Sequence, residues 1–596
     1  MKKRENTTGK SFKKSAILSI VVTIIAVLAI NIISSIWFFR IDLTQDHRHS
    51  LSQSTIELLK NLEDDIYIKV YMTGKSVPVT YQPIVHKTQE MLEEFGSYSS
   101  KVKFELIDPT EGKTPVEINA IYSELAHKGL YPTPIREQYA AGQSTKYIIP
   151  GAMVAYKTRE CPATLIEPDV SNRYSIEDYS YMRIEYNLML AIKSLVTQKK
   201  SDIAFIDGHG ELNYLNTSWM DLQLGYGMQN FYNVTRDSIN GRINALRKIS
   251  IADSSLKTIK DNGNKYDLLI IAQPTKMFNN RDKFVIDQHI MRGGKVLWLY
   301  DATDASIDSL ANKSAFLAMP ARTKLEHVFF RYGVRFNTNL IQDIGSCQAI
   351  PIINSQTNKV QTMIFPYALN ITHFENHPIT QKIASMRSCF AGTIDFVGKD
   401  DGLTKTVLAT TSDSCKLIPT PAIVTEAVGF AKPNPEEFNA QHKAVAVLVE
   451  GKFKSAYAGF LPMELDTVKE FNVLYESPET KQIFISDGDI IRNYFDTLVG
   501  PYPTGFDHQL KKFYGNTEFL INCVDYLCGN EDLIELRSKI FQIGTLDTRQ
   551  TMQGEVKMKY QLLNIGLPIL LLVVAGSIIL FIRTRKYKHY SLKTAR

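Results

Sequence analysis

Residues 203–212 read IAFIDGHGEL, an apolar run followed by three side chains that can do chemistry. Asp207, His209 and Glu211 alternate with two glycines and a leucine. The carboxylates can bind a cation, and the imidazole can act as a metal ligand or a general base. Glycine and aspartate are also the usual residues of tight turns. The stretch alone leaves open a catalytic or metal-binding turn, a phosphate cradle and a structural corner.

Two further apolar runs also end in acidic residues. Asp301 follows the run 295–300, and Asp487 and Asp489 follow the run 482–486. Ligands of open α/β sheets bind outside the carboxyl ends of the strands. If the three strands share one sheet, the sequence predicts an acidic crevice that binds a cation or a polyhydroxy ligand and raises carboxylate pKa values. The six candidate ligand-binding residues are Asp207, His209, Glu211, Asp301, Asp487 and Asp489.

Several familiar catalytic patterns are missing from the sequence. No Cys or Ser follows a strand inside a Gly-x-[Cys/Ser]-x-Gly turn, and a single histidine makes a poor zinc site. Lys69 stands where a phosphate-binding loop ending in Gly74-Lys75-Ser76 needs its first glycine. We therefore predict no enzymatic activity, no catalytic residue and no cofactor, and the identity of any metal stays unknown. For DGHGEL we favour a structural turn at a ligand-facing strand end.

Both ends of the chain carry membrane signals. The uncharged runs Ser15–Phe39 and Tyr560–Ile582 are each long enough to cross a hydrocarbon core about 30 Å thick as a helix. Each run has an excess of Lys and Arg on its distal tail, which the positive-inside rule places in the cytoplasm. The sequence therefore predicts two spans in the inner membrane, both termini cytoplasmic, and a large region between them on the periplasmic side.

Charge and cysteine content exclude two classes of protein. The amino-terminal tail carries +5 and the carboxyl-terminal tail +6, so the overall +6 leaves the rest of the chain at −5. An acidic outer region argues against nucleic-acid binding, and the basic tails fit anionic membrane lipid instead. The six cysteines form neither a disulfide framework nor paired metal spacing, so we expect buried thiols.

The outer region reads as alternating strands and helices. A helix capped by Ser54, a strand near 66–72, a helix over 81–98 and a strand near 101–109 predict a parallel βαβ unit. Continuous apolar strands at 202–208, 266–274, 295–304 and 482–489 predict a doubly wound parallel sheet covered on both faces. Such a fold is related to class I glutamine amidotransferases, although their nucleophilic cysteine is absent.

The composition divides the chain into predicted segments. These are a basic tail (1–14), a transmembrane helix (15–39), a membrane-proximal α/β domain (40–200), a doubly wound α/β domain (201–540) with an insertion at about 311–440, a juxtamembrane segment (541–559), a transmembrane helix (560–582) and a second basic tail (583–596).

Several of these stretches together resemble a known family. DLTQDHRHSLSQST after the first span, IDGHGEL, YDLLIIAQPTKMFNNRDKFVIDQHIMRGGKVLWLYD, ISDGD and GNTEFLINCVDYLCGNEDLIELRSK occur in order along the chain. With the two spans, they resemble the gliding-motility-associated ABC transporter auxiliary proteins of Bacteroidetes, usually labelled substrate-binding. The chain departs from that pattern at Ser486, where the family often has glycine before the acidic residue.

The resemblance implies a set of partners. It predicts a non-enzymatic extracytoplasmic subunit that works with an ABC permease and a cytoplasmic ATPase, with a role in gliding motility or envelope export. An envelope protein or a carbohydrate is the expected ligand. The alternative function is a membrane-anchored hydrolase or metal-dependent enzyme acting on envelope material.

Overall fold

The computed structural model describes three stretches of the chain. They are residues 20–28 without 23 and 26, residues 50–538, and residues 554–593. The second stretch is interrupted at 75–76, 140–141, 168–173, 198, 226–230, 254–257, 311–314, 354–359, 399–401, 461, 463–471 and 509. The chain forms two units, Met1–Ile540 and Phe541–Arg596. The predicted tail 1–14 and most of the predicted span 15–39 lie outside the described residues.

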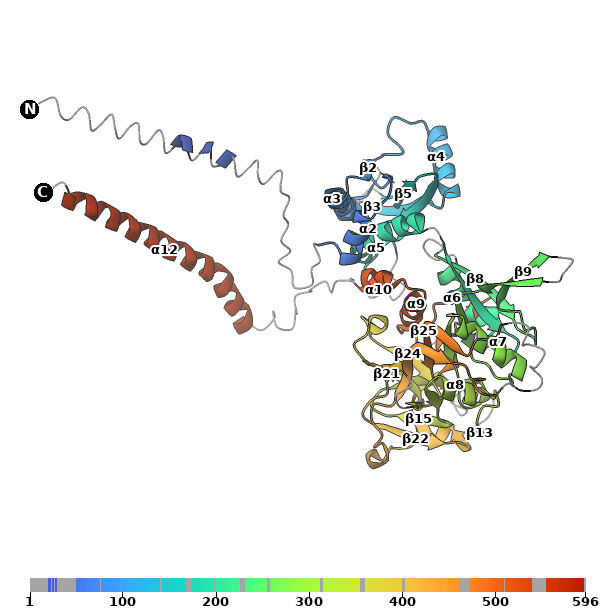
Figure 1. The fold of residues 1–596 in the computed structure, drawn as a ribbon. Coiled ribbons are helices and arrows are strands. Elements are labelled where there is room, and N and C mark those ends of the chain that lie inside the picture. The colour runs from blue at the N-terminus through green and yellow to red at the C-terminus, as the bar shows by residue number, and fades with distance from the viewer. Residues whose placement is uncertain are drawn as a thin grey trace, which may run out of the picture. The chain divides into compact units, whose positions relative to one another are not determined.

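The carboxyl-terminal unit contains one long helix, α12 (Gly554–Lys593), drawn in red in Figure 1. Its stretch Leu562–Ile582 is the one helix among the described residues that is long and apolar enough to cross a membrane. Pro568 lies inside it, and membrane helices tolerate proline there. The Ser577 and Thr584 hydroxyls donate to carbonyl oxygens four residues earlier, so their polar groups are satisfied within the helix. This helix coincides with the predicted second span.

The larger unit begins with a four-stranded sheet in the order β2-β1-β5-β6. Strands β1 and β2 pair in parallel across α3, which confirms the predicted βαβ unit. Strands β5 and β6 extend the sheet in antiparallel fashion, and α3 and α5 share a hydrophobic core with it. The elements are α2 (Gln53–Lys60), β1 (Ile66–Val70), α3 (Gln82–Tyr98), β2 (Val102–Leu106), α4 (Pro115–His127), the hairpin β3 (Thr133–Tyr139) and β4 (Gly142–Ile148), β5 (Gly151–Tyr156), β6 (Arg159–Thr164) and α5 (Ile176–Val196).

The cap of α2 differs from the prediction. Ser52, and not Ser54, precedes the first helical residue and accepts a hydrogen bond from the Thr55 amide at 3.1 Å. The reason is tertiary, because the Glu185 carboxylate of α5 accepts bonds from the Ser52 amide at 2.7 Å and from the Thr55 hydroxyl at 2.8 Å. The helix therefore begins two residues before the position that local pattern favours.

The main sheet has eight strands in the order β18-β21-β24-β25-β12-β11-β7-β8. Five strands, β25, β12, β11, β7 and β8, are parallel to their neighbours within that group. The apolar strands on both sides of the predicted insertion, β7 and β25, thus lie in one sheet. Their bounds, and those of the helices that connect or cover them, are β7 (Ser201–Asp207), α6 (Tyr214–Gly225), β8 (Tyr232–Ser238), β11 (Leu268–Ala272), α7 (Asn280–Met291), β12 (Lys295–Leu299), α8 (Glu326–Arg331), β25 (Glu476–Ile485) and α9 (Asn516–Leu527).

The expectation of a wholly parallel sheet is wrong at one edge. Strands β24, β21 and β18 are antiparallel to their neighbours, and β18 and β21 come from the segment predicted to be an insertion. The antiparallel strand β24 is as apolar and buried as its parallel neighbours, so its composition does not reveal its direction. The three bounds are β18 (His373–Phe374), β21 (Leu403–Thr410) and β24 (Ala444–Lys454).

The rest of that segment forms small antiparallel sheets. They pair β13 with β23, β14 with β20, β15 with β22, and β17 with both β16 and β19. Short hairpin-like pairs also occur at β9 with β10, β26 with β27 and β28 with β29. The bounds are β9 (Arg247–Asp253), β10 (Thr258–Asn264), β13 (Ala315–Ala318), β14 (Val334–Phe336), β15 (Asn339–Asp343), β16 (Cys347–Ile353), β17 (Val360–Ile371), β19 (Met386–Cys389), β20 (Ile394–Phe396), β22 (Cys415–Pro419), β23 (Ala422–Thr425), β26 (Phe495–Asp496), β27 (Gly500–Pro501), β28 (Phe506–Asp507) and β29 (Lys512–Phe513).

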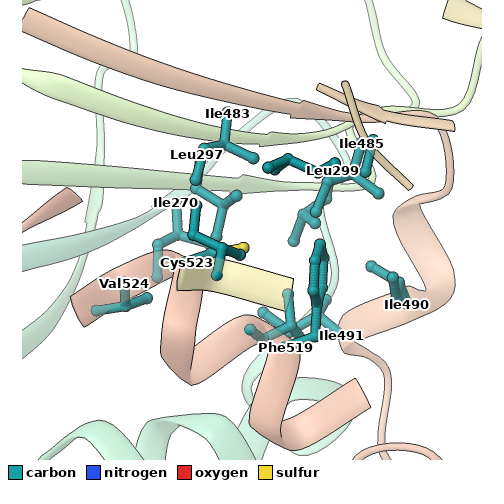
Figure 2. Close-up of a cluster of buried hydrophobic side chains, with 14 of the residues drawn as sticks. Ile270, Leu297, Leu299, Ile483, Ile485, Ile490, Ile491, Phe519, Cys523 and Val524 are labelled. Atoms are coloured by element: carbon teal, nitrogen blue, oxygen red, sulfur yellow. The ribbon is translucent and has the colours of Figure 1, made fainter. Parts of the chain in front are cut away.

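Both faces of the main sheet are buried by helices. On one face Phe519, Cys523 and Val524 of α9 point toward strand side chains that include Ile270 and Leu297, as Figure 2 shows. On the other face α7 and α8 pack against the alternate strand residues in a second core cluster. Burial on both faces explains why these strands read as unbroken apolar runs. All six cysteines are free. Cys161, Cys415 and Cys523 are buried as expected, whereas Cys347, Cys389 and Cys528 are only partly buried.

Helix α10 (Glu531–Ser538) joins the two sheet regions. Its Leu533 and Leu536 belong to the core of the four-stranded sheet, whereas Ile534 belongs to the core of the main sheet. Asp532 also pairs with Lys193 of α5. The last described helix before residue 540 is therefore packed into the first part of the unit.

Candidate functional site

The turn after β7 has the backbone that its glycines require. Gly208 and Gly210 have φ angles of +125° and +76°, a region that side chains disfavour. A Cβ at Gly210 would lie 2.2 Å from the Thr275 hydroxyl oxygen. The amides of Thr275 and Lys276 donate to the His209 carbonyl at 2.9 and 2.7 Å, which fastens this turn to the end of β11. The two glycines of DGHGEL are thus required by the backbone of this turn and by its contact with the segment after β11.

His209 is held between two carboxylates. Its Nδ1 lies 3.2 Å from Oε1 of Glu211, and its Nε2 lies 2.9 Å from Oδ2 of Asp282 at the start of α7. The ring stacks on Phe278, with centroids 3.7 Å apart and planes 9° apart. The side chains of His209 and Glu211 are buried, at 6 % and 1 % exposed.

The pair of carboxylates decides the protonation of His209. Burial by itself lowers the pKa of the imidazole, but the hydrogen bonds that the ring donates to Asp282 and Glu211 outweigh it and raise the pKa to about 9. At neutral pH both ring nitrogens carry protons, and both point at carboxylates. The imidazole therefore has no nitrogen free to accept a proton from a substrate, which removes it as a general base.

Asp207 lies in a separate ion-pair network. Its two carboxylate oxygens accept bonds from Nη2 and Nε of Arg236, on β8, at 2.7 and 2.9 Å. Arg236 also donates to the Leu212 carbonyl at 2.7 Å and pairs with Asp221 of α6 at 3.4 Å. This bidentate pair ties β7, α6 and β8 together at the sheet edge.

Asp301, Asp487 and Asp489 form a third group, at the ends of β12 and β25. The Asp301 carboxylate accepts bonds from the Gly488 amide at 2.7 Å and from the Gln273 side chain at 2.8 Å. Asp487 accepts from the Cys389 amide at 2.8 Å and from the Asp489 amide at 2.7 Å. These bonds join β11, β12, β19 and β25 at one edge.

The carboxylates of this group repel one another. Burial, together with the charge of Asp489, raises the pKa of Asp487 to about 7. Burial and the charges of both neighbours raise the pKa of Asp301 well above its ordinary range. The pKa of Asp489 is raised by burial and lowered again by Arg492, whose Nη1 lies 3.2 Å from it. Burial thus raises the pKa of all three carboxyls, and repulsion within the group adds to it at Asp301 and Asp487.

The six predicted residues thus lie at one sheet edge but in three groups. Each group has its own bonding partners on neighbouring elements. No set of three or more His, Cys, Asp or Glu side chains within the described ranges has the arrangement of a metal site. Sequence reasoning missed the partners Arg236, Asp282, Gln273 and Arg492. Only Asp282 had a local signal, because Asn279 and Asp282 begin a helix as a cap and a first-turn acid.

The order of the parallel strands marks a special place on this edge. Read in chain order, the five strands stand as 2-1-3-4-5, with the first and third strands, β7 and β11, adjacent. Connections from these two strands leave in opposite directions along the sheet. Ligands of doubly wound folds bind at such a switch point, outside the carboxyl ends of the strands.

Fold and site together define an α/β protein with an apolar carboxyl-terminal helix. Residues 200–523 match the family described as an ABC-type uncharacterized transport system, and the chain belongs to that family of transporter auxiliary components. The main sheet lies within the matched residues. The predicted family is confirmed at this level, and it gives the protein an accessory role beside a permease and an ATPase.

Other comparisons include parts of the chain outside residues 200–523. Residues 45–155 match a domain of unknown function. An uncharacterized protein of Borreliella burgdorferi is 22 % identical over 448 residues, which are 74 % of this chain and 78 % of that protein. Among solved structures, the mmIFT52 N-terminal domain matches with a TM-score of 0.30 and 12 % identity, covering 55 % of this chain and 97 % of that domain.

Proposed function

We propose that this protein is a non-enzymatic, extracytoplasmic subunit of an ABC transporter complex. Two spans anchor it, both termini are cytoplasmic, and the region between the spans lies in the periplasm. The family match over residues 200–523 is the observation that carries the proposal. The apolar helix Leu562–Ile582 and the basic residues beyond it support the membrane anchoring.

The test combines partner capture with topology. The full-length protein, purified in mild detergent, should bring down a permease and a separate ATPase, and alone it should not hydrolyse ATP. Single cysteines at Thr8 and Thr594 should resist a membrane-impermeant thiol reagent, whereas one at Ser255 should react. Labelling of either tail from outside, or ATP hydrolysis by the protein free of other subunits, contradicts the proposal.

Within the family we assign the chain to the gliding-motility-associated subgroup of Bacteroidetes. The support is the block GNTEFLINCVDYLCGNEDLIELRSK, which supplies α9 and α10. Deletion of the gene should impair surface translocation or envelope export. The alternative of an envelope hydrolase lacks support in the geometry, because His209 is held as an imidazolium between two carboxylates.

We further propose that the carboxyl edge of the main sheet binds the ligand, an envelope protein or a carbohydrate. The fold is a doubly wound sheet related to that of amidotransferases, and doubly wound sheets bind ligands at this edge. The turns at the edge contain the six candidate residues Asp207, His209, Glu211, Asp301, Asp487 and Asp489. Glu211→Gln and Asp487→Asn should impair complex function while folding and membrane insertion persist. If both variants lose stability and function together, the six residues serve the fold and not the ligand.

A further inference from the structure

A surface pocket lies beside the turn after β7. Its volume is about 570 Å³, and it is formed by the segment after β11 and the segment before α8. The two segments are joined by the bond from the Phe278 amide to the Thr323 carbonyl at 2.9 Å. The lining residues are Thr275, Lys276, Met277, Ala321, Arg322, Lys324 and Glu326.

The pocket adjoins the switch point of the sheet. Thr275 and Lys276 donate their amides to the His209 carbonyl, so one wall of the pocket is bonded to the turn that follows β7. The opposite wall is bonded to the segment that follows β12, through the Ala321 amide and the Ala302 carbonyl oxygen, 2.9 Å apart. The pocket therefore sits outside the carboxyl ends of β7, β11 and β12, where doubly wound folds take their ligands.

The pocket carries uncompensated positive charge. Lys276, Arg322 and Lys324 are exposed, and none forms an ion pair with another residue that the structure describes. The single acidic lining residue is Glu326. Lys283 of α7 does not line the pocket and is only 6 % exposed, but it lies close enough to interact electrostatically with Lys324 and Glu326. Burial lowers the pKa of Lys283, the charge of Lys324 lowers it further, and Glu326 opposes both.

We propose that this pocket binds the phosphate group of an anionic ligand. The lining side chains carry three positive charges and one negative charge, which matches a phosphate dianion. The planar guanidinium of Arg322 can donate two parallel bonds to phosphate oxygens, and the two lysines add charge without fixed geometry. A volume of about 570 Å³ accommodates a small ester attached to the phosphate.

The inference rests on the proposed function in one respect, that this edge is the ligand-binding edge. The proposed ligand differs from the carbohydrate or protein expected at this edge, because it carries an anionic group. The residues that bind it are also different from the six candidate residues of the strand ends. The phosphate has two possible sources, a soluble phosphate monoester or a lipid headgroup that ends in a phosphate monoester, and both present a dianion to the pocket.

The test measures phosphate binding to the full-length protein purified in detergent without partner subunits. Inorganic phosphate is titrated by calorimetry at constant ionic strength, with chloride as the replaced anion. The wild type should bind with a Kd of about 1 mM or tighter. Arg322→Gln and Lys324→Gln should each weaken binding by about tenfold or more, since each removes a charge-assisted bond. Lys452→Gln, an exposed cation of β24, is the matched control and should leave the Kd unchanged.

Several results overturn the inference. They are absence of phosphate binding by the wild type, equal binding by the two pocket variants, or equal weakening by Lys452→Gln. Thermal melting of each variant separates lost binding from lost folding, because a folded variant keeps the wild-type melting temperature. Transporter assembly is scored separately by capture of the permease, so failure of the phosphate site and failure of the proposed function give different results.

A competition experiment identifies the source of the phosphate. Glycerol 3-phosphate represents a lipid headgroup, and glucose 1-phosphate represents a soluble sugar ester. Tighter binding of the first assigns the pocket to lipid, and tighter binding of the second assigns it to a soluble ester. Equal displacement supports recognition of the phosphate group alone, whereas displacement by neither ester overturns the proposal.

Discussion

The charged state of His209 predicts a specific loss of stability in alkaline solution. Its pKa is raised from 6.5 to about 9 by two carboxylates. A group whose folded pKa is raised stabilises the fold fully below its unfolded pKa and loses that contribution as pH rises through the folded pKa. At about 1.4 kcal/mol per pKa unit, the free energy of unfolding should fall by about 3 kcal/mol between pH 6.5 and pH 9.

His209→Gln tests this reasoning. Glutamine removes the positive charge and leaves two buried carboxylates without a cation, so the variant should be less stable by about 3 kcal/mol at pH 6.5. The difference from the wild type should shrink toward zero above pH 9, where the wild-type imidazole is neutral. Urea unfolding of full-length protein in detergent, followed by pulse proteolysis at several pH values, measures both.

The other titrating groups change the stability outside the range from pH 6.5 to pH 9, or they contribute equally to the wild type and the variant. The pKa of buried His289 is lowered to about 4, so it affects stability only in acid. Asp487 titrates near pH 7, but it is present in both proteins and drops out of their difference. A wild-type to variant difference that stays constant from pH 6.5 to pH 9.5 would refute the assignment of a charged imidazole.

Three further changes have expected outcomes on stability. Asp301→Asn should raise the free energy of unfolding at pH 8 but not at pH 4, because its carboxyl has a raised pKa and is repelled only when charged. Gly210→Ala should cost about 2 kcal/mol, since its φ is +76° and its Cβ would meet Thr275, and Thr275→Ala in the same chain should recover part. Arg537→Met should cost about 3–5 kcal/mol, because it leaves Asp525 buried without its cationic partner, and chemical denaturation checks all three.

The strands and helices of the sheets could be predicted because their signals are local. Apolar runs such as 268–272 and 295–299 are buried on both faces, and burial leaves this trace in the sequence. Strand direction could not be predicted at β24, since its composition matches that of its parallel neighbours. The cap of α2 was also missed, because a carboxylate of Glu185 more than 130 residues away selects Ser52.

The position of the candidate site could be predicted from the sequence, but the bonding partners of its residues could not. Asp207, Asp301 and Asp487 were placed at strand ends because each follows an apolar run. Their partners lie on other elements, as Arg236 does on β8, and nothing in the alternating pattern of β8 marks that arginine as a ligand of Asp207. The basic pocket was missed for the same reason, because its cations come from segments about 46 residues apart.

The contact of α2 with α10 has a mechanical consequence. Ser54 of α2 bonds to Glu535 of α10, and Leu59 shares a core with Leu533 and Leu536. The two ends of the region from residue 50 to residue 538 are therefore in contact with each other. A force applied between those two ends therefore acts first on the contact of α2 with α10. The hydrogen bonds of the eight-stranded sheet lie between the two ends in the chain, so they bear no force until that contact breaks.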